Sequence, residues 1–252
     1  MNDNWYRKKI NKSEIEALSL LSLLEIQVFP EYYYDSYNLY TKKCTQNSDF
    51  SISLFLKVIE LCNNSLYCYE FSDYSPGVYS FLGNSCLSIN NKTYPEYLIH
   101  QLSELISKNL INIPYQKLKS LIIRLSPMLM NMKNVILHGD LHPGNVVLDK
   151  EKIYLIDFEY LRFGPKELEI AYFMIFYCLN FNSNFSKLNE IFAKIESLKI
   201  CNMTTLKFIF FPLIVIFLLD ALENKRVRND VIKEEILIDL IINYYSKINF
   251  KV

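Results

Sequence analysis

The sequence predicts an α+β fold, with a small strand-containing N-terminal part followed by a larger, mostly helical part. Three observations predict it. Residues 28–44 alternate between apolar and polar side chains and are rich in Tyr, residues 134–157 contain apolar runs joined by short turns, and residues 166–248 have a helical pattern with few breaks. Period-two alternation is typical of half-buried strands, whereas apolar residues three to four positions apart are typical of amphipathic helices.

Composition excludes several classes of protein. The chain has 252 residues, of which 51% are hydrophobic and 21% are charged, so it can bury a sizeable core. Its 27 basic and 27 acidic residues balance, which argues against a nucleic-acid-binding surface. The six cysteines lack the paired spacing of a zinc site. The N-terminal sequence is polar and has no signal-peptide core, so we expect a cytoplasmic protein with free thiols.

The first half of the chain predicts elements in a clear order. Residues 12–26 have a polar start and apolar residues at helical spacing, which indicates a helix. Residues 28–44 predict two short strands joined by a turn at Asp35. A second helix is expected over residues 50–62, and residues 63–95, which contain several turn signals, are expected to be mostly loop.

Further helices are predicted over residues 96–109 and 115–131. The apolar stretch 208–219 resembles a membrane segment at first sight, but it has twelve residues where a spanning helix needs about 20. It also contains Pro212 and is followed by acidic residues. We therefore expect a buried core helix and no transmembrane segment, with contact to a membrane surface as the alternative.

The sequence HGDLHPGN, residues 138–145, lies between two apolar runs and carries polar side chains that a buried strand does not need. A hairpin is expected directly after it, and the return strand of that hairpin brings Asp157 back beside the loop. Asp140, Asn145 and Asp157 would then converge at one end of the hairpin. Two carboxylates and an amide oxygen are hard ligands that suit Mg²⁺, which takes its remaining ligands from phosphates and water.

Phosphoryl transfer requires such a set of side chains. One carboxylate orients the attacking hydroxyl and accepts its proton, and a second carboxylate with an amide holds the metal against the phosphates. The sequence therefore predicts Asp140 as the catalytic base, with Asn145 and Asp157 as metal ligands.

The spacing of these residues equals that of the kinase loop H-x-D-L-x-x-x-N with its downstream metal-binding Asp. HGDLHPGN followed by IDFE resembles the aminoglycoside phosphotransferase and choline kinase superfamily, the small-molecule branch of the protein-kinase-like fold. The resemblance implies a two-lobe fold, with a shortened, strand-containing N-lobe over residues 1–48 and a helical C-lobe over residues 49–252. It also implies ATP and Mg²⁺ as cofactors and a small molecule with a hydroxyl group as acceptor.

The same resemblance suggests roles for the neighbours of these residues. His138 would support the backbone of the loop, and His142 would pack or hydrogen-bond near the site. Glu159 matches the third position of the family's D-[FW]-[ED] motif. Glu169 stands where the family usually has an Asp, which is a mild departure.

Upstream, the resemblance assigns the parts of a nucleotide site. The segment WYRKKI resembles the lysine strand, with Lys8 in register and Lys9 as the alternative, and Glu16 would be the helix glutamate that pairs with the lysine. The segment expected to meet the adenine ring comprises Lys42, Lys43 and Cys44.

The family's Gly-rich loop is not found in the sequence, since no glycine precedes Gly77. The backbone N–H groups of that loop normally cover the phosphates. The nucleotide could be held mainly by the metal and Lys8, a partner chain could cover the N-lobe, or the protein could be a pseudokinase that binds without transfer. Retention of Asp140, Asn145 and Asp157 favours an enzyme.

Overall fold

The computed structural model describes most of the predicted elements. The described residues are 5–46, 50–71, 78–81, 84–87, 132–180 and 185–210, together with the single helical positions 103, 107, 123, 213 and 214. The helices expected over residues 96–109 and 115–131 lie outside the described residues apart from three of these positions.

The chain forms two compact units. One consists of residues 1–88 and 133–169, and the other of residues 89–132 and 170–252. The lobe boundary expected after residue 48 would divide the first unit further, and it stays a prediction.

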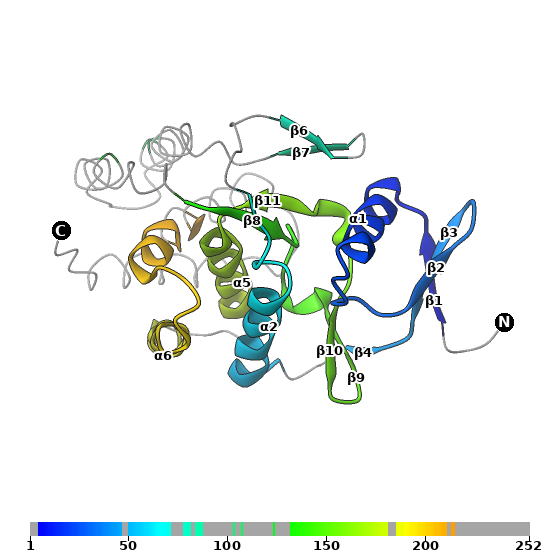
Figure 1. The fold of residues 1–252 in the computed structure, drawn as a ribbon. Coiled ribbons are helices and arrows are strands. Elements are labelled where there is room, and N and C mark those ends of the chain that lie inside the picture. The colour runs from blue at the N-terminus through cyan, green and yellow to red at the C-terminus, as the bar shows by residue number, and fades with distance from the viewer. Residues whose placement is uncertain are drawn as a thin grey trace. The chain divides into compact units, whose positions relative to one another are not determined.

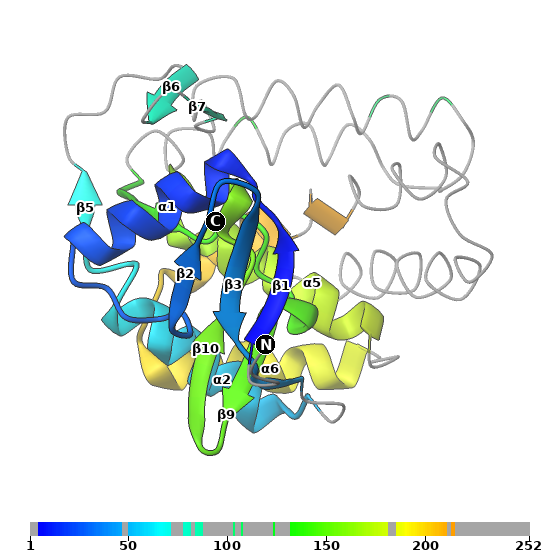
Figure 2. The same cartoon turned by 90° about the vertical axis from the view of Figure 1, so that its right-hand side faces the viewer.

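A three-stranded antiparallel sheet begins the first unit. It consists of β1 (Trp5–Lys9), β2 (Tyr32–Tyr34) and β3 (Asn38–Lys42) in the order β1-β3-β2. Helix α1 (Lys12–Leu23) follows β1 and lies beside this sheet (Figure 1, Figure 2). The predicted succession of strand, helix and two strands is therefore present.

Helix α1 begins and ends at recognisable signals. At its N-cap, the side chain of Asn11 accepts a hydrogen bond from the backbone N–H of Ser13 at 3.0 Å. The helix ends at Leu23, three residues earlier than expected, because Glu25 adopts a left-handed conformation with φ of 59°. One face of the helix enters the core through Ala17, Leu18 and Leu21.

Helix α2 (Ile52–Asn64) has Ser51 as its N-cap, whose hydroxyl accepts from the N–H of Leu54 at 3.2 Å. Its buried face repeats at helical spacing and consists of Leu54, Phe55, Val58, Ile59 and Cys62. This helix agrees with the one predicted over residues 50–62, and it extends two residues further.

The expectation of loop over residues 63–95 is wrong for three short strands. These are β5 (Glu70–Phe71), β6 (Val78–Phe81) and β7 (Asn84–Leu87), of which β6 and β7 pair with each other. Strands of two to four residues are too short for alternation to distinguish them from turns.

The residues around the HGDLHPGN loop form two small antiparallel sheets. In the first, β8 (Asn134–Leu137) pairs with β5 and with β11 (Arg162–Gly164), a strand that the sequence analysis did not predict. The predicted hairpin is β9 (Val146–Asp149) and β10 (Lys152–Leu155), and β9 also pairs with β4 (Thr45–Gln46). Two 3₁₀ turns complete this region: η1 (Pro143–Asn145) and η2 (Phe158–Tyr160).

Helix α5 (Lys166–Asn180) begins in the first unit, and its residues from 170 onward belong to the second. The second unit continues with α6 (Phe185–Leu198) and a helical stretch over residues 203–210. Within the apolar stretch 208–219, the described residues Phe208, Ile209, Phe210, Leu213 and Ile214 are buried, as expected for a core helix. Among the described residues, no helix is long and apolar enough to cross a membrane.

Candidate active site

Strand β8 leads directly into the HGDLHPGN loop, and His138 links this loop to the end of the hairpin. Its ring is fully buried, with Nε2 at 2.9 Å from the carbonyl oxygen of Ile156 and Nδ1 at 3.3 Å from the backbone N of Asp140. Because the carbonyl can only accept and the N–H can only donate, the proton lies on Nε2. Burial lowers the pKa of His138 to about 4, so the ring is neutral at pH 7.

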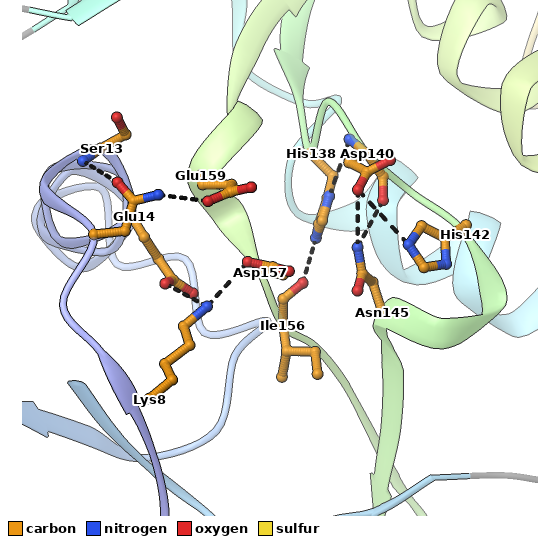
Figure 3. A network of polar contacts seen from close by, with 11 residues as sticks. Lys8, Ser13, Glu14, His138, Asp140, His142, Asn145, Ile156, Asp157 and Glu159 are labelled. Atoms are coloured by element: carbon orange, nitrogen blue, oxygen red, sulfur yellow. Dashed lines mark hydrogen bonds and ion pairs between the residues drawn. The ribbon is translucent and has the colours of Figure 1, made fainter. Parts of the chain in front are cut away.

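Asp140 is surrounded by two side chains of the same loop (Figure 3). Asn145 Nδ2 donates to the backbone oxygen of Asp140 at 2.9 Å and lies 3.5 Å from its Oδ2. His142 Nε2 lies 3.6 Å from Asp140 Oδ2, while its Nδ1 accepts from the N–H of Gly144 at 3.0 Å. Since the amide nitrogen of Asn145 is committed to Asp140, Oδ1 is the atom that can ligate a cation.

Gly139 holds the loop in a conformation that other residues rarely adopt. Its φ is +88°, and a Cβ at this position would lie 1.8 Å from the carbonyl oxygen of Tyr160. Its backbone N–H donates to Glu169 Oε1 at 2.7 Å, and the hydroxyl of Tyr67 donates to Glu169 Oε2 at 3.0 Å. Burial raises the pKa of Glu169. Glu169 was noted in the sequence as a departure from the family, but nothing local indicated its contact with Tyr67.

Asp157 also has a left-handed backbone, with φ of 68° and ψ of 59°. It lies directly after Ile156, whose N–H donates to the carbonyl oxygen of Asn145 at 3.0 Å. This bond ties the two predicted metal ligands to the same end of the hairpin. A left-handed conformation is uncommon for a residue other than glycine, although Asp tolerates it better than most, and such residues cluster at functional sites.

Lys8 lies between two carboxylates. Its Nζ is 2.6 Å from Glu14 Oε2 and 3.0 Å from Asp157 Oδ1. Burial lowers the pKa of Lys8, but the hydrogen bonds to Glu14 and Asp157 outweigh it, so the net pKa lies above its ordinary value and the ammonium is charged. Glu14 is buried, whereas Lys8 is partly accessible.

The expectation that Glu16 pairs with the strand lysine is wrong, because Glu14 occupies that place. Glu16 instead lies 3.6 Å from Lys12 on the same helix. Two residues along a helix correspond to a rotation of about 200°, so when Leu18 and Leu21 face the core, Glu14 faces it as well and Glu16 does not.

The alternative lysine, Lys9, does not take the place of Lys8. Successive side chains of a strand point to opposite faces. Lys8 lines a cavity beside β1, and Lys9 is exposed.

This cavity has a volume of about 580 Å³ and lies within the first unit. Its size falls in the range of small-molecule and cofactor sites, roughly 300–1,000 Å³. Lys42, Lys43 and Cys44 are at its wall, as the adenine-binding segment was expected to be, while Glu16 is not. The lining residues are Tyr6, Lys8, Glu14, Thr41, Lys42, Lys43, Cys44, Val147, Ile156 and Asp157.

Asp157 and Asn145 are the residues that could hold a metal. Within the part of the chain that the structure describes, no three His, Cys, Asp or Glu side chains form a metal-binding cluster. Mg²⁺ does not need one, since it commonly binds one or two protein oxygens and takes its other ligands from phosphate and water. The donor set fits Mg²⁺ bound together with a nucleotide.

The lysine–glutamate pair, the HGDLHPGN loop and the hairpin that carries Asp157 are arranged as expected for a protein-kinase-like fold. Residues 98–189 match the sequence model of the phosphotransferase enzyme family. A stretch of 65 residues is 37% identical to the protein LicA homolog of Mycoplasma capricolum subsp. capricolum and covers 25% of this chain and 26% of that protein. The match therefore spans about a quarter of that relative's length.

Solved structures support the same fold. A choline/ethanolamine kinase family protein from Mesorhizobium loti has a TM-score of 0.59 at 11% identity, over 99% of this chain and 85% of that chain. Choline kinase LicA from Streptococcus pneumoniae has a TM-score of 0.54 at 14% identity, over 98% and 87%. The GDP complex of aminoglycoside 2'-phosphotransferase-IIIa has a TM-score of 0.59 at 16% identity, over 97% and 87%. These matches confirm the predicted fold class and the predicted resemblance.

Proposed function

We propose that the protein is an ATP- and Mg²⁺-dependent kinase that phosphorylates a hydroxyl group of a small molecule. The observation that carries this proposal is the grouping of Asp140, Asn145 and Asp157 at one end of the hairpin, with Lys8 held beside Asp157 at 3.0 Å. Phosphoryl transfer needs little covalent chemistry from a protein, and these groups provide the positioning and charge that it does need.

On the nucleotide side, the charged Lys8 would bind the phosphates, and the wall of the cavity at Lys42, Lys43 and Cys44 would meet the base. The solved structures of similar fold include complexes with GDP and with AMP. Asp157 and Asn145 would hold Mg²⁺, which neutralises charge on the phosphates when bound. Asp157 would exchange part of its contact with Lys8 for the metal.

On the acceptor side, Asp140 would orient the hydroxyl and accept its proton. The amide of Asn145 and the ring of His142 would orient Asp140, and the neutral His138 would hold the loop backbone that carries it. The similar structures are named as choline and aminoglycoside kinases, so choline, ethanolamine and amino sugars are the first acceptors to test. A partner chain over the N-lobe and a cytoplasmic location stay predictions.

The first experiment measures Mg²⁺-dependent ATP binding by calorimetry. Asp157→Asn should lose the Mg²⁺-dependent part of the affinity, about tenfold or more, because one metal ligand loses its charge. Glu151→Gln, at an exposed position in the turn between β9 and β10, removes the same charge away from the site and should bind as the wild type does.

The second experiment measures phosphate transfer from labelled ATP to a panel of acceptors. Asp140→Asn should lower kcat by about 10²–10⁴-fold while ATP affinity changes by less than about twofold. Normal turnover in this variant would exclude Asp140 as the base. Absence of Mg²⁺-dependent nucleotide binding in the folded wild type would refute the proposed function.

A further inference from the structure

We propose that Asn11 is a positioning residue that, through Glu159, holds the N-terminus of α1 against the loop that carries Asp157 and thereby keeps Glu14 on Lys8. The inference rests on the proposed function, because it assigns a residue that aligns the nucleotide site. Asn11 does not line the cavity, so its effect on nucleotide use would pass through other residues.

The amide of Asn11 uses both of its ends. Its Oδ1 accepts from the backbone N–H of Ser13 at 3.0 Å and caps α1. Its Nδ2 donates to Glu159 Oε2, a residue 148 positions away in the sequence. Ser, Thr or Asp could cap the helix equally well, but none of them carries an N–H₂ group. The choice of Asn at this position is explained by the second contact, to Glu159.

The contact between Asn11 and Glu159 and the contacts of Lys8 form a closed ring together with two short backbone segments. Figure 3 shows Lys8 between Glu14 and Asp157, with Glu159 nearby. Glu159 lies two residues after Asp157, Asp157 contacts Lys8 at 3.0 Å, and Lys8 contacts Glu14 at 2.6 Å. Glu14 lies in the first turn of α1, three residues after Asn11. Helix α1 also packs directly on η2, the turn that contains Glu159. The loop that carries Asp157 therefore fixes the position of the first turn of α1. This first turn then fixes the position of the Glu14 carboxylate.

The bond between Asn11 and Glu159 keeps Lys8 in contact with both Glu14 and Asp157. If the Asn11–Glu159 bond is lost, the first turn of α1 can move away from η2 and Glu14 moves with it. Lys8 would then be held by Asp157 alone and would compete with the metal for that carboxylate. A displacement of about 1 Å at a site of this kind can reduce the rate about 100-fold.

A double-mutant cycle distinguishes the contact between Asn11 and Glu159 from the role of Asn11 as the N-cap of α1. Asn11→Asp keeps an acceptor for the N–H of Ser13 but sets a carboxylate against the carboxylate of Glu159. Glu159→Gln still offers an acceptor to Asn11, and in the double variant its amide can donate to the introduced carboxylate. We expect Asn11→Asp to lower kcat/KM for ATP about tenfold in the wild-type background and less than about twofold in the Glu159→Gln background.

A second measurement does not need an active enzyme. The rate at which the Lys8 amine is acylated by a soluble ester is followed by mass spectrometry, with the exposed Lys152 as an internal control. An amine that no longer donates to Glu14 is freer to react with the ester, so Asn11→Asp should raise the acylation rate of Lys8 about three- to tenfold relative to Lys152. Glu159→Gln in the same chain should return the rate to that of the wild type.

The outcomes are distinguishable. If the wild type neither binds nor turns over ATP, the proposed function fails, and the acylation rates still decide the role of Asn11. If Asn11→Asp has the same effect on kcat/KM and on Lys8 acylation in both backgrounds, the contact with Glu159 does not position the site and the inference is overturned. A residue that serves only as a cap would give that result.

Discussion

Lowering the pH from 7 to 5 should destabilise the protein through His138. The ring is fully buried, and Nδ1 accepts a hydrogen bond from the backbone N–H of Asp140, which it can do only in the neutral form. Burial lowers its pKa from 6.5 to about 4. In the unfolded chain the ring takes up a proton near pH 6.5, whereas in the folded chain it does so only near pH 4. The unfolded state therefore binds more protons between these values, and stability falls as the pH falls through this window.

The size of the effect follows from the two pKa values. Each unit of difference between the pKa in the unfolded chain and the pKa in the folded chain lowers the free energy of unfolding by about 1.4 kcal/mol once the pH lies below both values. Between pH 7 and pH 5, only part of the difference is realised, and the contribution of His138 to the free energy of unfolding falls by about 2 kcal/mol. This is a large fraction of the stability of a typical domain, about 5–15 kcal/mol.

The assay is urea unfolding of the wild type and of His138→Gln at pH 7 and at pH 5. Other groups that titrate in this range are present in both proteins, so the difference between the two losses isolates His138. The wild type should lose about 2 kcal/mol more than the variant. If His138→Gln does not fold, the titration of His138 is followed by NMR in the wild type. Equal losses, or a His138 titration near pH 6.5, would refute the reasoning.

Three further predictions concern single side chains. Gly139→Ala should lower the free energy of unfolding by about 3 kcal/mol or more in chemical denaturation, because φ is positive and the added Cβ meets backbone atoms. Gly164→Ala should lower it by less than about 1 kcal/mol, because its Cβ meets only the end of a leucine side chain. Glu14→Gln should lower kcat/KM for ATP about tenfold or more, and Glu16→Gln less than about twofold. Tyr67→Phe should lower the free energy of unfolding by about 1–2 kcal/mol, measured by denaturant titration, because a buried carboxylate loses a donor.

Each of these predictions has a result that contradicts it. Equal stability of the two Gly→Ala variants would mean that the loop relaxes around the new methyl group. Equal activity of Glu14→Gln and Glu16→Gln would mean that the ion pair with Lys8 does not matter for nucleotide use. A Tyr67→Phe variant as stable as the wild type would mean that its hydroxyl bond has no net value.

The sequence by itself determined the part of the site that is local. The HGDLHPGN loop and the hairpin behind it bring Asn145 and Asp157 together through about a dozen consecutive residues, so turn signals and apolar runs were sufficient to predict their proximity. The helix after the strand of Lys8 was also predictable, because an amphipathic pattern is a property of a contiguous segment, whereas the strand itself was predicted from its resemblance to the family's lysine strand.

Tertiary structure alone decided the contacts between distant segments. Whether Glu14 or Glu16 meets Lys8 depends on the rotation of α1, which the packing of Leu18 and Leu21 sets and the sequence pattern leaves open. The strands of two to four residues form because a neighbouring strand supplies their hydrogen bonds, as β8 does for β5.

The same reason applies to the polar network of the site. Lys8 meets Asp157 across 149 positions, Asn11 meets Glu159 across 148, and Tyr67 meets Glu169 across 102. No periodicity or turn signal connects residues at such distances, since the free energy that holds them together comes from burial and packing of the whole first unit. The chemistry could therefore be predicted from one short segment, whereas the residues that position it could be found only after the chain had folded.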